Sequence, residues 1–120
     1  MTVETTSTTE AVLQHHLQAI FARDLDAIVS DFADDAVFFT PFGSSKGPDQ
    51  IRAAFAAIMN LVTPEVMAEM KLGQQHIDGE FAYILWSAGA HITTASDTFC
   101  VRNGKIVLQT FVGAGPLLTS

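Results

Sequence analysis

DLDAIVSDFADDAVFFTPFGSSKGPDQIRAAF, residues 24–55, is the stretch of sequence that decides the fold. It begins with a short helix for which Asp24 is a suitable N-cap. The apolar face of that helix consists of Leu25, Ile28, Val29 and Phe32. Residues 33–35, Ala-Asp-Asp, are predicted to end the helix, and residues 36–40 form a β-branched and aromatic strand that stops at a proline. A mobile Gly/Ser loop follows, and Pro48 lies in the first turn of a new helix.

Two other helical patterns complete the helical part of the chain. Upstream, a helix is predicted to begin near residue 8 with a capping box formed by Ser7 and Glu10. Its apolar face has helical spacing and carries Leu13, His16, Leu17, Ile20 and Phe21. The helix that begins at Pro48 buries a similar stripe, which comprises Ile51, Phe55, Ile58, Met59 and Val62. The dipeptide Thr63–Pro64 ends this helix.

The remainder of the chain is predicted to be a meander of antiparallel strands. These strands span about 66–77, 81–87, 91–102 and 105–112. The Asp78–Gly79 and Asn103–Gly104 dipeptides between them favour tight hairpins. Three helices followed by a block of strands predict an α+β fold, in which the helices cover one face of the sheet.

The strand at residues 81–87 is apolar on both of its faces. Period-two alternation places Tyr83, Leu85 and Ser87 on one face and Ala82, Ile84 and Trp86 on the other. A sheet that is apolar on both sides needs a second cover, and a homodimer provides one. We therefore predict that Ile84 and Trp86 lie in a dimer interface and that Tyr83 and Leu85 face the interior.

Length and composition fit one domain, residues 1–120, with loose ends at about 1–7 and 114–120. The formal charge is −7 and the six basic residues are scattered, which argues against binding to nucleic acid or to an anionic membrane. Neither a signal peptide nor an apolar run of membrane-spanning length is recognisable. Cys100 is the single cysteine, so the chain cannot form an internal disulfide, which fits a cytoplasmic protein.

The order of elements in residues 24–55, together with Asp97–Phe99 and Asn103–Lys105, resembles the NTF2-like superfamily and in particular its SnoaL-like and ketosteroid-isomerase-like branch. The resemblance covers about residues 10–112. It implies a cone in which three helices pack on a curved antiparallel sheet around an apolar pocket, and dimerisation through the outer face of the sheet. Fold alone does not determine the reaction.

Ketosteroid isomerases use an aspartate base before a proline at the end of the first strand. A tyrosine on the first helix and a protonated aspartate on a late strand form the oxyanion hole. The resemblance places Thr40 at the base position, His16 at the tyrosine position and Asp97 at the late aspartate position. A threonine hydroxyl is too weak a base to abstract a carbon-bound proton, which argues against steroid isomerisation. The limonene-epoxide-hydrolase branch needs an Asp–Arg–Asp array, which exposed or loop-proximal arginines would not supply.

His16 and Asp97 are the residues on which a chemical role is predicted. Histidine titrates near neutrality and suits proton transfer, but His16 would also fit as a core residue hydrogen-bonded to the backbone. Asp97 lies in an otherwise uncharged strand, where burial should raise its pKa. Its alternatives are a place at a sheet edge or a pair with Arg102 or Arg52. His15, the chain neighbour of His16, is predicted to be exposed.

The predicted function is that of a cofactor-independent acid–base enzyme, of the isomerase, cyclase or dehydratase type, acting on a small apolar carbonyl or polyketide-like compound. The alternative is a non-catalytic module of the same fold that binds a small ligand or dimerises. His16 and Asp97 form the expected acid–base pair, and neither a metal nor a cofactor is expected. The ligand-binding wall is predicted to comprise Thr40, Phe38, Phe55, Met59, Met67, Tyr83, Leu85, Phe99 and Phe111.

Overall fold

Four α-helices and six strands follow one another along residues 2–118, the part of the chain that the computed structural model describes, with side chains from residue 8. The helices are α1 (Thr2–Ala22), α2 (Leu25–Ser30), α3 (Gly47–Leu61) and α4 (Pro64–Met67). The strands are β1 (Phe32–Thr40), β2 (Gly43–Lys46), β3 (Met70–Asp78), β4 (Phe81–Ala88), β5 (Ile92–Arg102) and β6 (Lys105–Ala114). A 3₁₀ turn, Pro116–Leu118, follows β6.

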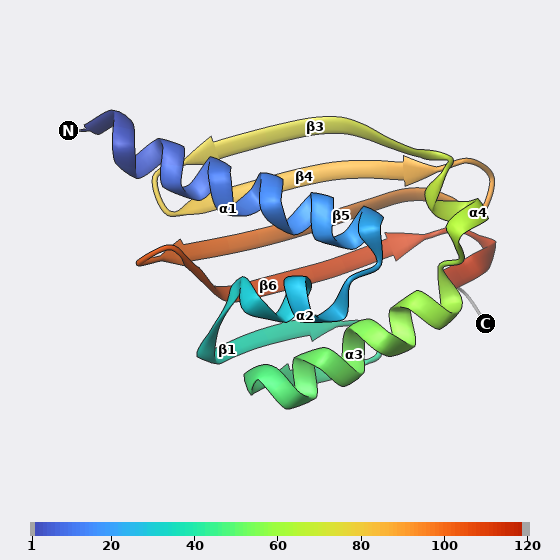
Figure 1. The fold of residues 1–120 in the computed structure, drawn as a ribbon. Coiled ribbons are helices and arrows are strands. Elements are labelled where there is room, and N and C mark those ends of the chain that lie inside the picture. Colours follow the sequence, from blue (N-terminus) through green and yellow to red (C-terminus); the bar gives the residue numbers. More distant parts are fainter. Residues whose placement is uncertain (1, 119–120) are drawn as a thin grey trace.

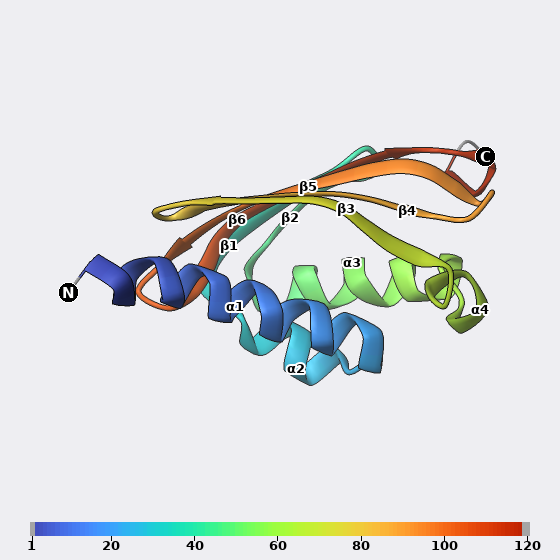
Figure 2. The same ribbon diagram turned by 90° about the horizontal axis from the view of Figure 1, so that it is seen from above.

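The strands form one sheet in the order β2-β1-β6-β5-β4-β3 (Figure 1). All neighbours are antiparallel except β1 and β6, which are parallel. Figure 2 shows that the sheet is curved and that α1, α2 and α3 all lie on the same side of it. The α+β cone of the NTF2-like fold is therefore confirmed.

Local sequence explains how the helices begin. The carboxylate of Asp24 caps α2 by accepting a hydrogen bond from the backbone N–H of Ala27 at 3.1 Å, as predicted. Pro48 lies in the first turn of α3, where its missing N–H costs no intrahelical bond. Ile51 and Phe55 are buried on the face of α3 that packs on the sheet. This packing fixes α3 as one wall of the interior.

Several predicted boundaries were wrong. Helix α1 begins at Thr2 and not near residue 8, and the side chain of Ser7 lies outside the described residues. Strand β1 begins at Phe32, so that Asp34 and Asp35 are exposed strand residues and not a turn. Register with β6 and burial of Phe32 outweigh the turn preference of two aspartates.

Two elements appear where loop or strand was predicted. Residues 43–46 form β2 and pair with β1, so the Gly/Ser segment is a short edge strand. Residues 64–67 form α4, and the strand predicted from Val66 begins instead at Met70. Thr63 caps α4 through a hydrogen bond from the N–H of Val66, which explains why the chain turns helical there.

The two faces of β4 are reversed relative to the prediction. Ile84 is 2% exposed and lies, with Trp86, on the face that the helices cover, so neither belongs to an outer interface. Tyr83 and Leu85 lie on the outer face. Alternation separates the two sets but cannot tell which set faces the helices. The register decides it, because Ile84 stands beside the inward-facing Asp97 of β5.

None of the described helices combines the length and the apolar character that crossing a membrane requires.

Candidate active site

A cavity of about 90 Å³ lies between the helices and the covered face of the sheet. That volume can hold several water molecules or a small organic group. Most of its wall is apolar, and its polar members are His16, Arg23, Trp86, Asp97 and Gln109. The apolar members are Leu17, Ile20, Phe38, Phe55, Ile58, Met59, Val62, Met67, Met70, Ile84, Phe99 and Phe111.

His16 lies in the apolar stripe of α1 and is 2% exposed. The rings of Phe32, Phe55 and Phe99 surround its imidazole edge-on, with centroids 5.5–5.8 Å away. Its Nδ1 atom is buried without a hydrogen bond and lies 3.7 Å from Oδ2 of Asp31. With Nδ1 turned toward Asp31, the opposite ring nitrogen, Nε2, is the one available to the cavity.

Asp97 lies on the inner face of β5 and is held by two neutral donors. The indole Nε1 of Trp86 donates to Oδ1 at 2.8 Å, and Nε2 of Gln109 donates to Oδ2 at 2.9 Å. Burial raises the pKa of the Asp97 carboxyl; the bonds from Trp86 and Gln109 and the nearby His16 oppose this shift without cancelling it. The protonated carboxyl is thereby favoured, and it could donate a hydrogen bond to a ligand in the cavity.

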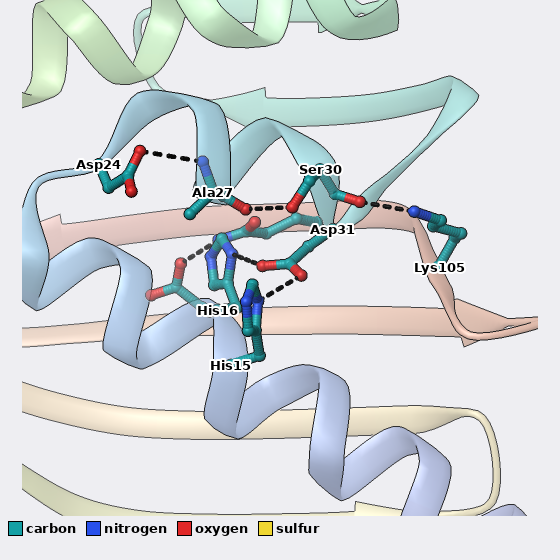
Figure 3. A network of polar contacts seen from close by, with 9 residues as sticks. His15, His16, Asp24, Ala27, Ser30, Asp31 and Lys105 are labelled. Carbon is teal, nitrogen blue, oxygen red and sulfur yellow. Dashed lines mark hydrogen bonds and ion pairs between the residues drawn. The ribbon is translucent and has the colours of Figure 1, made fainter.

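Asp31 is a site residue that the sequence reasoning missed. It follows α2, its side chain is about 10% exposed, and Oδ1 accepts a hydrogen bond from Nδ1 of His15 at 2.7 Å (Figure 3). The signal that could have identified it is an aspartate between Ile28 and Phe32, both of which are buried.

Arg23 is a second residue whose part in the site the sequence analysis missed. It lies next to a loop, as expected, in the turn between α1 and α2, but its side chain reaches the cavity wall. Its guanidinium donates to the carbonyls of Val62 at 2.7 Å and Met59 at 2.6 Å. Arg23 therefore caps the end of α3 and joins that end to the α1–α2 junction.

The structure brings His16 and Asp97 into one cavity wall, but each has hydrogen-bonding or ionic partners of its own. Six of the predicted wall residues are also there, namely Phe38, Phe55, Met59, Met67, Phe99 and Phe111. Thr40, Tyr83 and Leu85 are not. The hydroxyl of Thr40 accepts from the N–H of Phe42 and lines a separate groove between β2 and α3.

Tyr83 and Leu85 miss the cavity because they are on the outer face of β4. The ring of Tyr83 stacks there on His76 of β3 at 6.2 Å. Trp86 and Ile84, predicted for the outer face, take their places in the wall. Among the described residues, no group of three or more His, Cys, Asp or Glu side chains is arranged to hold a metal ion.

Residues 13–109 match the family model of the SnoaL-like domain. The chain matches none of the curated proteins. Among solved structures, an NTF-2-like protein of unknown function from Burkholderia xenovorans LB400 is 21% identical, with a TM-score of 0.76 over 93% of this chain and 87% of that one. A proposed polyketide cyclase from Sinorhizobium meliloti is 19% identical, with a TM-score of 0.70 over 84% and 93%. A proposed ketosteroid isomerase from Kribbella flavida DSM 17836 is 13% identical, with a TM-score of 0.68 over 91% and 79%. At these identities the likeness to solved structures shows the fold alone.

Proposed function

The chain belongs to the SnoaL-like domain family, and we propose that its cavity is the active site of a cofactor-independent acid–base enzyme acting on a small apolar carbonyl or polyketide-like compound. The observation that carries the proposal is that His16 and Asp97, two titratable side chains, line one largely apolar cavity. The names given to the S. meliloti and K. flavida structures support a reaction of the cyclase or isomerase type.

Asp97 is suited to the role of acid. Its raised pKa favours the form that carries a proton. Each carboxyl oxygen has a second lone-pair position, so Asp97 can be protonated while Trp86 and Gln109 keep their hydrogen bonds. A carbonyl oxygen in the cavity would accept the Asp97 proton or hydrogen bond, which stabilises negative charge as an enolate forms.

His16 is suited to the role of base. Nε2 of the unprotonated imidazole would remove the proton from the carbon next to the carbonyl group. The enol or enolate has three outcomes: reprotonation at another carbon isomerises the compound, loss of a β-hydroxyl group dehydrates it, and attack on a second carbonyl closes a ring. Thr40 lies outside the cavity wall, so His16 is the base in this scheme and steroid isomerisation remains disfavoured.

Deuterium exchange tests the proposal without knowledge of the natural substrate. Small ketones such as cyclohexanone are incubated with the protein in D₂O, and NMR measures loss of the protons next to the carbonyl. The wild-type protein should accelerate exchange, and H16A and D97A should each lose about a hundredfold of that acceleration. H76A, which changes an exposed histidine on β3, is the control and should match wild type. Exchange that persists unchanged in both H16A and D97A would contradict the proposal.

The rival function is non-catalytic binding of a small ligand. One observation favours it: Thr40, which stands at the base position of ketosteroid isomerases, lies outside the cavity wall and lines a separate groove. An enzyme must also bring His16 and Asp97 within about 3 Å of a common reacting group. A binding module would broaden or shift the NMR signals of the ketones without exchanging their protons. The deuterium experiment therefore separates the two functions.

A further inference from the structure

The buried imidazole of His16 has a polar connection to the protein surface on the side away from the cavity. We propose that His15, Asp31 and His16 form a proton relay that links this imidazole to solvent. The proposal extends the proposed function, because a relay serves catalysis only if His16 is the base. Its geometry and its test do not depend on turnover.

The three side chains lie next to one another, with the carboxylate of Asp31 between the two imidazoles (Figure 3). The side chain of His15 is 54% exposed, and its Nδ1 lies 2.7 Å from Oδ1 of Asp31. The other carboxylate oxygen of Asp31, Oδ2, lies 3.7 Å from Nδ1 of His16, whose side chain is 2% exposed. Both atoms of that second pair are buried and have no hydrogen bond. One carboxylate thus contacts an exposed histidine on one oxygen and a buried histidine on the other.

With a ligand in the cavity, the polar route from His16 to solvent that the described residues offer runs through Asp31 and His15. Phe32, Phe55 and Phe99 surround the ring, and a bound ligand would cover Nε2. When Nε2 takes a proton, the proton on Nδ1 can pass to Oδ2 of Asp31. In the state with His15 protonated on both ring nitrogens, its Nδ1–H keeps the hydrogen bond to Oδ1 of Asp31 while its Nε2 releases a proton to water. One proton enters at His16 and one leaves at His15, so the summed charge of the three side chains is unchanged.

The 3.7 Å gap must shorten for the transfer. A hydrogen bond needs about 2.9 Å, a closure that rotation of the Asp31 side chain can provide. The backbone of Asp31 is fixed, because its carbonyl accepts from the N–H of Ile106 at 2.8 Å. Protonation of His16 would attract the Asp31 carboxylate and favour closure. The other charged groups nearby are Asp97 across the cavity and Lys105, whose Nζ donates to the carbonyl of Ser30.

The test measures how fast the Nδ1 proton of His16 exchanges with water in ligand-free, ¹⁵N-histidine-labelled protein. H15Q keeps a hydrogen-bond donor for Asp31, but the glutamine amide cannot pass a proton on. D31N keeps a hydrogen-bond acceptor for His16, but the asparagine amide cannot pass a proton on either. Both variants should slow the exchange about tenfold or more. H91Q is the matched control, because exposed His91 lies 3.4 Å from a carboxylate, that of Glu69, and is not part of the relay. H91Q should exchange as wild type does.

An exchange rate at His16 that is unchanged or faster in H15Q would overturn the relay. H15Q alters an exposed side chain, so it yields a folded protein for the measurement even if D31N does not. The ¹⁵N shifts of the same sample report the tautomer of His16. A lost tautomer preference in D31N with unchanged exchange would assign Asp31 a purely structural role and also overturn the relay. Failure of ketone exchange with a confirmed relay would instead reject only the proposed function.

Discussion

Gln109 holds Asp97 with only one end of its side-chain amide: Nε2 donates to Oδ2 of Asp97 at 2.9 Å, whereas Oε1 is buried without a hydrogen-bond partner. Trp86 supplies the other donor, and both donors are neutral. An ionised Asp97 is therefore stabilised mainly by dipoles in an apolar wall, which explains why burial dominates its pKa.

This arrangement predicts that D97N stabilises the protein at neutral pH. The folded state holds the Asp97 proton more tightly than the unfolded state, so the contribution of Asp97 is fully present below the unfolded pKa and is lost as pH rises through the folded pKa. D97N removes the loss of stability that ionisation of Asp97 causes. The side-chain N–H that the substitution introduces can donate to Oε1 of Gln109 after rotation of the Gln109 amide. The gain should be about 1 kcal/mol.

Urea unfolding of wild type and D97N across the acidic to neutral range checks this prediction. The difference in unfolding free energy should be near its minimum below a pH of about 4, where the unfolded-state carboxyl is protonated, and should grow with rising pH. A D97N variant that loses stability relative to wild type as pH rises would show that the ionised carboxylate is favoured by the fold.

The indole of Trp86 should matter through Asp97 more than through packing. W86F keeps an aromatic ring in the wall but removes the donor to Oδ1 of Asp97. We expect it to cost about 1–3 kcal/mol of stability at neutral pH, since the carboxylate loses one of its two hydrogen bonds. In the D97N background the same change should cost less, and urea unfolding of the four proteins gives the coupling directly. Equal costs in both backgrounds would mean that Trp86 acts by packing alone.

The candidate site was predictable where a single residue breaks a pattern. His16 interrupts an apolar helical stripe and Asp97 interrupts an uncharged strand, and both lie in the cavity wall. The orientation of β4 was not predictable, because alternation is symmetric and only the register with β5 shows which face lies under the helices. Asp31 escaped notice because its burial depends on α1, which packs over it from elsewhere in the sequence.

Arg23 shows a different limit of local reasoning. A charged residue at the end of an amphipathic helix is usually solvated, but its positive φ of 56° turns the chain at the α1–α2 junction. The guanidinium then reaches α3, which is distant in the sequence. Contacts between segments far apart in the chain decide where such a side chain points. Local helix and turn propensities carry no information about these contacts.

R23A is expected to loosen the end of α3. The substitution removes both hydrogen bonds that the guanidinium donates, to the carbonyls of Met59 and Val62. The cost should be about 1–3 kcal/mol in unfolding free energy, with faster amide exchange in the last turn of α3. R52A is the control, because the pair of Arg52 and Asp26 is largely exposed and is expected to contribute less than about 1 kcal/mol. Equal effects of R23A and R52A would contradict a capping role for Arg23.

The outer face of the sheet remains the predicted dimer interface, with different residues from those first assigned. Val112 is 57% exposed and Phe81 is 55% exposed. Leu85 and Val112 lie in one row on either side of Ser96, and Tyr83 lies in the next row. No helix of the described residues lies on this side of the sheet (Figure 2), so its apolar side chains face solvent unless a second copy covers them.

V112K places a charge in the middle of that face and should separate a dimer into single chains. Sedimentation measures the mass, which is 12.9 kDa for one chain. Wild type should sediment at twice this mass and V112K at the mass of one chain, because burying an unpaired lysine is costly. F21K is the matched control, since Phe21 is also exposed but lies on α1, on the helix side of the sheet. A monomeric wild type, or dissociation by F21K and not by V112K, would rule out the outer face as the interface.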